Sequence, residues 1–317
     1  MKPITLVIFL FLSIVTFGQS DDEFMSWDSL QTTQESNNNS TVVTSQANPK
    51  SGDEDSFVVS GESLALIALS LTILSAFFVQ NHNGRKYRVF FLVISLIFFG
   101  FYASGCPCPV CGVINFTLAS IGVSELHASG YWFLALLPIT WVFGKTWCGW
   151  VCHLGALQEL LFKKGNFTFL TSANAQKVLS YIRYASFVLL MIQVVITQSN
   201  LWKEIDPFRV AYSLIGTNTL SYILLVLLIV SSITIYRPFC RAICPLGLVL
   251  SWVSAIPGAM GIKQGSEKCG ACKACSEACD YGVITRAGNK SQCNAKECIM
   301  CGDCIDDCKR DVIEFNR

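Results

Sequence analysis

Two cysteine blocks near the C-terminus constrain the fold of this chain more than any other feature. Both follow the spacing C-x2-C-x2-C-x3-C, the first reading CGACKACSEAC from Cys269 and the second CIMCGDCIDDC from Cys298. Each block is followed at the same offset by a Val-Ile pair, so the two blocks form an internal repeat of 29 residues. The chain has 16 cysteines, far more than a reduced core needs, and their spacing therefore calls for a chemical explanation.

The spacing of the two blocks is that of a bacterial ferredoxin with two [4Fe-4S] clusters. In such proteins the fourth cysteine of each block binds the cluster of the other block. Structural zinc sites also use C-x2-C pairs, but three cysteines at successive x2 spacings followed by x3 are unusual for zinc. Cys293 fits neither block and is interpreted as a spare thiol. The expected ligand sets are Cys269, Cys272, Cys275 and Cys308 for one cluster, and Cys298, Cys301, Cys304 and Cys279 for the other.

The remainder of the chain is strongly apolar. Hydrophobic residues make up 52% of the sequence and charged residues 14%, against about 25% charged residues in an ordinary soluble domain. This composition excludes a disordered, collagen-like or nucleic-acid-binding protein and favours a membrane protein, while the net charge of +1 indicates no strongly charged partner. Five apolar segments are predicted to be transmembrane helices: residues 63–80, 89–104, 131–146, 184–201 and 220–236.

The N-terminal residues predict an exported segment. Residues 1–19 contain an apolar run that is short for a membrane span of about 20 residues, and they are interpreted as a signal peptide. Residues 20–62 are rich in Ser, Thr, Asn, Gln and Asp and are expected to form a disordered exported tether. The predicted fold is mainly α, with a polytopic helical membrane domain over residues 63–260 and an α+β ferredoxin domain over residues 261–317.

Basic residues in the loops predict the orientation. They follow the first, third and fifth apolar segments, whereas residues 105–130 contain no Lys or Arg, and only Lys203 and Arg209 oppose the trend. The positive-inside rule then places the ferredoxin domain in the cytoplasm and the tether outside, in a multi-pass protein of the inner (cytoplasmic) membrane. The basic residues on the predicted cytoplasmic side are Arg85, Lys86, Arg88, Lys145, Lys163, Lys164, Lys177, Arg183, Arg237 and Arg241.

A second repeat lies where two of these helices reach the cytoplasm. KTWCGWVCHLGAL from Lys145 aligns without a gap with RPFCRAICPLGLV from Arg237, at an offset of 92 residues. In each copy a C-x3-C pair precedes an amphipathic stretch, residues 154–162 or 246–253, whose N-terminus favours thiolates. The four cysteines of the two pairs are Cys148, Cys152, Cys240 and Cys244. They could bind a further iron–sulfur cluster, cycle between dithiol and disulfide, or simply pack the helix ends. A reducing cytoplasm argues against a static disulfide, and the repetition of the pairs favours a redox role.

His153 extends the first pair to C-x3-C-H, which is one residue longer than the haem c attachment motif. The second copy has Pro245 at the matching position, and the motif is predicted to lie in the cytoplasm, so a covalent haem is not expected. A lone histidine near a membrane interface is interpreted as structural. The alternatives are a hydrogen-bond donor behind the redox centre and a proton acceptor for quinol.

The predicted outward loop carries three closely spaced cysteines, Cys106, Cys108 and Cys111. Prolines between them stiffen the segment. On the oxidising side of a membrane these thiols could form a disulfide, bind a soft metal such as Cu(I), or help to hold a cofactor. The sequence leaves these three alternatives open.

The paired C-x3-C motifs, the C-P-L-G sequence of the second copy and the C-terminal double-cluster ferredoxin resemble the NapH and NosR membrane ferredoxins of anaerobic respiration. The resemblance covers residues 90–313. It implies electron transfer between the quinol pool and a reductase outside the membrane, with other redox subunits as partners, as in the electron-transfer subunit of a quinol dehydrogenase. His153 stands in place of the family's proline, and the tether is too short for the exported FMN-binding domain of NosR-like members.

Two other functions share much of this pattern. CcoG-type assembly factors combine a C-x3-C-P membrane domain with a double-cluster ferredoxin and are associated with copper handling, which the outward cysteines would suit. A redox sensor would carry the same clusters without turnover. No nicotinamide motif, phosphate-binding loop or acid–base constellation is visible, so quinol is the one organic substrate expected. Cluster reduction by quinol would favour electron transfer, and stoichiometric copper at the outward loop would favour assembly.

Overall fold

The structure is a computed structural model that describes residues 61–163, 173–213, 218–264, 269, 272–287 and 290–316. The predicted signal peptide, residues 20–60 of the predicted tether and Lys164 lie outside the described residues. The last two residues assigned to the tether, Gly61 and Glu62, already belong to the first described helix, so the boundary at residue 63 is two residues late.

All five predicted apolar segments are helical. They form α3 (Gly61–Gln80), α5 (Arg88–Ser95) continued by the π-helix η2 (Leu96–Tyr102), α7 (Ala128–Phe143), α9 (Ala173–Thr197) and α12 (Thr219–Thr234). Helix α9 begins at Ala173 rather than at residue 184, because its first turns are polar and pack beside the ferredoxin domain, where hydropathy gives no signal. Among the described residues, two helices, Gly61–Gln80 and Asn174–Thr197, are long and apolar enough to cross a membrane, and the other apolar helices are shorter. Five membrane crossings therefore stay a prediction.

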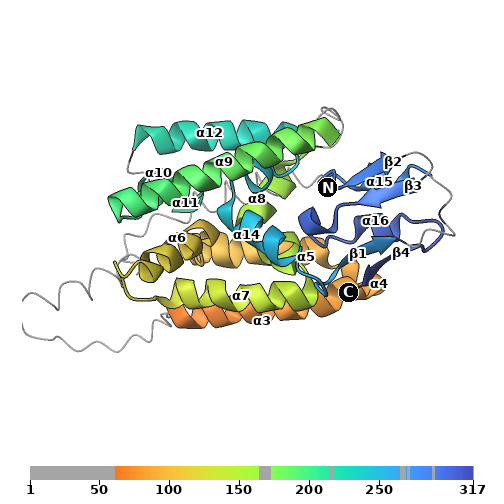
Figure 1. Cartoon of the computed structure of the whole chain (residues 1–317), viewed down its shortest axis with the longest axis horizontal. Coiled ribbons are helices and arrows are strands. Elements are labelled where there is room, and N and C mark those ends of the chain that lie inside the picture. Colours follow the sequence, from red (N-terminus) through yellow and green to blue (C-terminus); the bar gives the residue numbers. More distant parts are fainter. Residues whose placement is uncertain are drawn as a thin grey trace, which may run out of the picture.

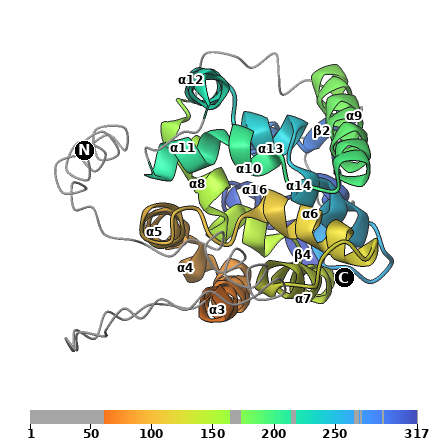
Figure 2. The same cartoon turned by 90° about the vertical axis from the view of Figure 1, so that its left-hand side faces the viewer.

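Two helices that hydropathy did not single out lie at the end of the molecule far from the ferredoxin domain. They are α6 (Pro109–Ser120) and α11 (Pro207–Ser213), which follows the short helix α10 (Trp202–Ile205). Each begins with a proline after a capping residue, and proline is favoured at a first helical position because its missing N–H needs no partner there. Figure 2 shows α6 and α11 lying across the view, while α3, α5 and α12 are seen close to end-on.

The second repeat forms two similar helical turns on the ferredoxin side. In the first copy α7 leads into the π-helix η3 (Trp147–Val151) and then α8 (His153–Leu161). In the second copy α12 leads into α13 (Pro238–Ala242) and then α14 (Pro245–Val253). The amphipathic stretches predicted over residues 154–162 and 246–253 are thereby confirmed as α8 and α14.

The C-terminal domain has the two-fold layout that its repeat predicts. Strand β1 (Gly261–Gln264) pairs antiparallel with β4 (Ile313–Asn316), and β2 (Ile284–Ala287) pairs antiparallel with β3 (Lys290–Cys293). Between them lie α15 (Ala274–Ala278), the 3-10 turn η5 (Ala295–Glu297) and α16 (Asp303–Asp306). Each cysteine block is therefore followed by a strand that starts at the isoleucine of its Val-Ile pair.

The short helix α4 (His82–Arg85) and its neighbours tie the helical domain to the ferredoxin domain (Figure 1). Arg85 Nη2 lies 2.6 Å from Asp306, and Arg183 Nη2 lies 2.5 Å from Glu297. The buried core is continuous across the junction, from Trp150 to Met300. Basic residues of α4 and α9 thus pair with acidic residues of the ferredoxin domain.

Candidate redox centre

The four cysteines of the C-x3-C pairs lie together, although the two pairs are 92 residues apart. Electrostatic interactions couple Cys244 to Cys240, Cys152 and Cys148, and couple Cys152 to Cys240 and Cys148. Cys152 and Cys244 are each 7% exposed. Burial raises the pKa of all four thiols, that of Cys240 to about 11. We call these four residues the cysteine tetrad; the structure brings together the soft ligands that a shared redox centre would need.

The second cysteine of each pair caps the helix that follows it. Cys152 precedes α8 and Cys244 precedes α14, both with an extended backbone. The Gly247 N–H donates to Cys244 Sγ over 3.4 Å, whereas Cys152 at the matching position interacts with the Gly155 N–H without a cap hydrogen bond of normal geometry. Because a helix N-terminus carries partial positive charge, this capping geometry favours an anionic sulfur at both positions.

Gln158 joins the two copies beside the tetrad. Its side chain is fully buried, and its Nε2 donates to the Leu154 carbonyl over 2.9 Å and to Cys240 Sγ over 3.6 Å. Its Oε1 accepts a hydrogen bond from the Phe239 N–H over 2.9 Å. The amide therefore fixes the second pair against α8, an arrangement that the sequence repeat alone does not reveal.

A buried ion triad holds the backbone of the first pair. Glu159 accepts from Arg88 Nη2 over 2.8 Å and from Arg237 Nε over 2.9 Å. Arg88 Nε also donates to the Gly149 carbonyl over 3.2 Å, and Arg237 Nη1 donates to the Cys148 carbonyl. Burial alone would raise the pKa of Glu159, but the two guanidinium groups outweigh it and lower that pKa. The carboxylate therefore stays ionised and keeps both arginines in place.

The first pair docks directly on the second cysteine block of the ferredoxin domain. Trp150 Nε1 donates to the Met300 carbonyl over 2.9 Å, and Gly149 lies so close to the Ile299 carbonyl that a Cβ atom would not fit. Lys145 Nζ lies 4.0 Å from Glu297 and interacts electrostatically with both Cys148 and Cys298. A single ammonium group thus lies between the tetrad and the second cysteine block.

Within the ferredoxin domain the fourth cysteine of the first block lies with the second block. Electrostatic interactions couple Cys279 to Cys298, Cys301 and Cys304. Burial raises the pKa of Cys298 to about 11, and the Met300 N–H donates to its sulfur over 3.4 Å. Buried thiols with N–H donors are the environment in which [4Fe-4S] clusters are held, so these residues fit one cluster.

Among the described residues, no three His, Cys, Asp or Glu side chains converge on a single metal ion. A cubane cluster makes a different demand, because each of its four thiolates binds a different iron. Of the other expected set, Cys275 and Cys308 are buried, Cys269 is half-buried and Cys272 is exposed. That ligand set stays a prediction.

Cys293, interpreted from the sequence as a spare thiol, lies close to both expected ligand sets. It ends β3 and interacts electrostatically with Cys298, Cys279 and Cys275. Its position follows from strand pairing with Ile284, which brings it next to the Val-Ile pair of the first block. Cysteine spacing carries no signal for such a position.

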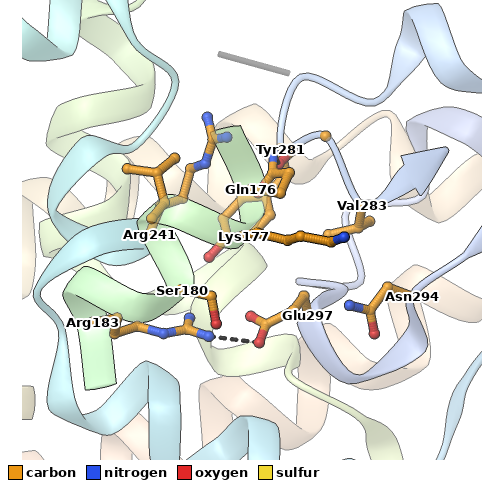
Figure 3. A pocket seen from close by; sticks show the side chains of 11 residues that line it. Gln176, Lys177, Ser180, Arg183, Arg241, Tyr281, Val283, Asn294 and Glu297 are labelled. Carbon is orange, nitrogen blue, oxygen red and sulfur yellow. Dashed lines mark hydrogen bonds and ion pairs between the residues drawn. The ribbon is translucent and has the colours of Figure 1, made fainter. Parts of the chain in front are cut away.

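A pocket of about 310 Å³ opens between the helical and ferredoxin domains (Figure 3). The start of α9 contributes Lys177 and Arg183, α13 contributes Arg241, and the ferredoxin domain contributes Tyr281 and Glu297. The Arg241 guanidinium lies 5.8 Å from the centre of the Tyr281 ring, and Arg183 pairs with Glu297. The pocket therefore adjoins the residues next to both Cys279 and Cys298.

His153 lies on the other side of the tetrad, away from the ferredoxin domain. It is completely buried; its ring interacts with the backbone of Gly105, but neither ring nitrogen makes a hydrogen bond of normal geometry within the described part of the chain. Its ring centre lies 5.5 Å from that of Tyr212 and 6.4 Å from that of Phe99. Burial lowers the pKa of His153 to about 3, so the imidazole is neutral. A purely structural role explains the packing of this ring but leaves its two buried nitrogens unexplained.

The three outward cysteines lie at the end of the molecule opposite the ferredoxin domain. Cys108 caps α6, and its sulfur accepts a hydrogen bond from the Cys111 N–H over 3.5 Å. All three thiols are half-buried. Asp206, which caps α11, is an electrostatic neighbour of Cys108.

Comparison with known proteins finds sequence similarity to iron–sulfur proteins. The family described as "4Fe-4S binding domain" matches residues 128–170 and 217–263, and each match contains one C-x3-C copy. An uncharacterized protein of Methanocaldococcus jannaschii is 29% identical over 227 residues, which are 69% of this chain and 90% of that protein. No solved structure gives a significant match.

Two relatives carry informative names. The regulatory protein NosR of Stutzerimonas stutzeri is 27% identical over 75% of this chain, which corresponds to 35% of NosR. The ferredoxin-type protein NapH of Escherichia coli strain K12 is 26% identical over 53% of this chain and 60% of NapH. These matches confirm the predicted resemblance and support an iron–sulfur electron-transfer protein of the NapH/NosR type.

Proposed function

We propose that this protein is a membrane-bound iron–sulfur electron carrier that passes electrons between the quinol pool and a respiratory reductase. The observation that carries the proposal is the docking of the first C-x3-C pair on the second cysteine block. Trp150 bonds to Met300 across this contact, and Lys145 interacts with Cys148 on one side and Cys298 on the other. Two sets of redox-capable thiols in one buried junction are what electron transfer between them requires.

The lipid bilayer is the proposed environment of the helical domain. Helix α9 is only 11% buried over its apolar window. Leu189 and Ile196, for example, are 66% and 75% exposed. A continuous apolar face of this kind is unfavourable in water and marks a membrane or protein contact. We place the ferredoxin domain in the cytoplasm, as the loop charges predict, and a C-terminal reporter that is active only on the exported side would contradict this orientation.

Two [4Fe-4S] clusters are the proposed cofactors of the ferredoxin domain. Such a cluster supplies a centre that accepts and returns one electron. Cys298, Cys301, Cys304 and Cys279 would hold one, and Cys269, Cys272, Cys275 and Cys308 the other. The chain itself contributes N–H donors to the sulfurs, such as that of Met300, and an apolar cover from Ile299 and Ile313 that excludes water.

The cysteine tetrad is proposed as a further redox centre on the membrane side of the junction. Its members could hold an additional cluster or cycle as dithiols, and these alternatives differ in iron content. Roughly eight iron atoms per chain would indicate two clusters, and roughly twelve would indicate a third at the tetrad. Gln158 and the Glu159 ion triad position the sulfurs in either case.

The junction pocket is the proposed site for quinol. A quinol needs a hydrogen-bond donor at one ring oxygen and a proton acceptor at the other as it is oxidised. Lys177 and Asn294 offer donors, and Glu297 offers a carboxylate (Figure 3). Tyr281 on the pocket wall interacts electrostatically with Cys240, which places the pocket between the tetrad and the ferredoxin domain.

Anaerobic purification followed by iron and sulfide counting and EPR spectroscopy tests the cofactors. Iron, sulfide and two interacting [4Fe-4S] signals are expected, whereas zinc without iron would refute the proposed clusters. Stopped-flow mixing with a soluble quinol then tests the function, because quinol should reduce the clusters in a single turnover. The Lys177→Gln variant should need several-fold more quinol with unchanged EPR signals, and the exposed Lys273→Gln variant serves as its control.

A further inference from the structure

A further thiol pair lies at the far end of the helical domain, away from the proposed path between quinol and the ferredoxin clusters. The motif is Cys108-Pro109-Val110-Cys111, at the start of the twelve-residue helix α6. The Cys108 sulfur caps the helix by accepting from the Cys111 N–H, and the two thiols also hydrogen-bond to each other. Cys108 is the N-cap and Cys111 the third residue of the helix, so both thiols lie at the same helix end. A disulfide needs Cβ atoms about 3.5–4.5 Å apart, which a small adjustment of this helix end would allow.

Tyr212 connects this pair with the cysteine tetrad. Its side chain is 5% exposed and interacts electrostatically with Cys108 on one side and with Cys152 and Cys240 on the other. Its hydroxyl donates to the His153 carbonyl over 3.1 Å. Tyr212 therefore lies in the buried core within electrostatic range of both the tetrad and the outward thiols.

The outward loop and the end of η2 pack closely against the Tyr212 ring. Gly105, with a φ of +84°, leaves space for the ring, because a Cβ atom there would come within 3.3 Å of Tyr212 Cδ2. At Gly100 a Cβ atom would come within 2.9 Å of Tyr212 Cε1. The Phe101 ring centre lies 5.5 Å from that of Tyr212. Close packing from two segments holds the ring in one place, as a relay between fixed redox groups requires.

We propose that Cys108 and Cys111 form a redox-active dithiol–disulfide pair that takes electrons from the tetrad and reduces disulfides of an exported protein. This inference rests on the proposed function for its supply of electrons. It adds a second electron outlet at the exported face and assigns Tyr212 as a positioning residue between the two thiol groups.

The reaction balances with the groups named. Reduction of the Cys108–Cys111 disulfide breaks one S–S bond, consumes two electrons delivered singly through the tetrad, takes up two protons and gives two thiols. Asp206 lies beside Cys108, and burial raises the pKa of its carboxyl to about 6, so it can pass on protons taken from the exported side.

The second half-reaction is thiol–disulfide exchange. Cys108 Sγ already accepts the Cys111 N–H at the start of α6, so we assign Cys111 as the attacking thiol, which gives up its proton as it attacks, and Cys108 as the resolving thiol. Cys111 attacks the disulfide of the exported protein and forms a mixed disulfide, and the first partner sulfur leaves and takes a proton. Cys108 then loses its proton and displaces the second partner sulfur, which is protonated in turn. The pair returns to the disulfide and the partner gains two thiols.

The test uses the full chain with Cys106→Ser, so that the pair is isolated from the third thiol of its loop. After anaerobic oxidation with diamide the protein is treated with dithionite, quenched with a maleimide at set times, and analysed by mass spectrometry of the peptide that carries both cysteines. EPR spectra of the same samples report cluster reduction independently. We expect no maleimide on this peptide before reduction and two afterwards.

Variants separate transfer through the chain from direct reduction by dithionite. Cys240→Ser and Tyr212→Leu should slow the appearance of the two thiols at least tenfold while the ferredoxin clusters are still reduced, and Tyr212→Phe, which keeps the ring, should restore the rate. Equal rates in all variants would overturn the inference and leave the proposed electron carrier intact. Free thiols after diamide treatment would also overturn it, and so would stoichiometric copper that blocks the maleimide until a copper chelator is added. Failure of quinol to reduce the clusters would instead count against the proposed function.

Discussion

Replacement of Gly149 by alanine should undock the ferredoxin domain from the cysteine tetrad. Gly149 lies in η3 between the cysteines of the first pair, and a Cβ atom there would fall closer than 3.0 Å to the Ile299 carbonyl oxygen and 3.2 Å from its carbon. Both obstructing atoms are backbone, so no side chain can rotate away. The docking surfaces must separate to admit the methyl group.

The cost of this separation can be estimated from the contacts involved. Inserting a methyl group into a packed interface costs about 1–3 kcal/mol. Separation also lengthens the 2.9 Å hydrogen bond from Trp150 to Met300, and such a bond contributes about 0.5–1.5 kcal/mol. A total of roughly 2–4 kcal/mol lowers the docking equilibrium roughly 30- to 900-fold. Alanine has a higher helix propensity than glycine, so a change in helix propensity cannot explain a loss of docking in this variant.

Limited proteolysis and stopped-flow reduction measure the effect together. Residues 255–258 are exposed between α14 and β1, and their cleavage should accelerate when the domain undocks, while quinol-driven cluster reduction slows. Gly247→Ala is the matched control, because its Cβ would meet its nearest neighbour at 3.6 Å, an ordinary contact. If Gly149→Ala matched this control in both assays, the docking argument would be wrong.

Three further outcomes are expected. Single Cys→Ser changes in the tetrad should slow quinol-driven cluster reduction nearly as much as the quadruple change, because members of one centre act as a unit; a quadruple variant with the wild-type rate would exclude a shared centre. Glu159→Gln should lower the free energy of unfolding by about 3–5 kcal/mol, since it leaves Arg88 and Arg237 buried without their carboxylate; a thermal melt within 1 °C of wild type would contradict this. The lowered pKa of Glu159 means that its ion pairs stabilise the protein above the unfolded carboxyl pKa of about 4.3. Wild-type stability should therefore fall as the pH drops below that value, and Glu159→Gln should lack this part of the pH dependence. Cys279→Ser should abolish the EPR signal of the cluster held by the second block and spare the other, and loss of the opposite signal would reverse the ligand assignment.

Sequence periodicity and spacing were sufficient for much of the fold. The apolar runs predicted all five long helices because burial or lipid contact demands apolar side chains along their whole length. The repeated cysteine blocks and Val-Ile pairs predicted two matching halves of the ferredoxin domain, and the structure adds that β2 and β4 begin at the isoleucines of those pairs. Hydropathy placed the start of one helix too late. Helix α9 begins at Ala173 rather than at residue 184, because its first turns carry polar side chains that face the ferredoxin domain.

Part of the candidate site could also be predicted from the sequence, and part of it depends on the tertiary structure. The sequence by itself determined which thiols could be ligands, since C-x2-C and C-x3-C spacings are properties of neighbouring residues. Only the tertiary structure brought Cys148, Cys152, Cys240 and Cys244 together, Lys145 into electrostatic range of Cys148 and Cys298, and Tyr212 into electrostatic range of the tetrad and Cys108. These contacts join segments that are tens of residues to more than 150 residues apart in the chain. Nothing in local spacing encodes them, because they arise when separate helices pack their buried faces into one core.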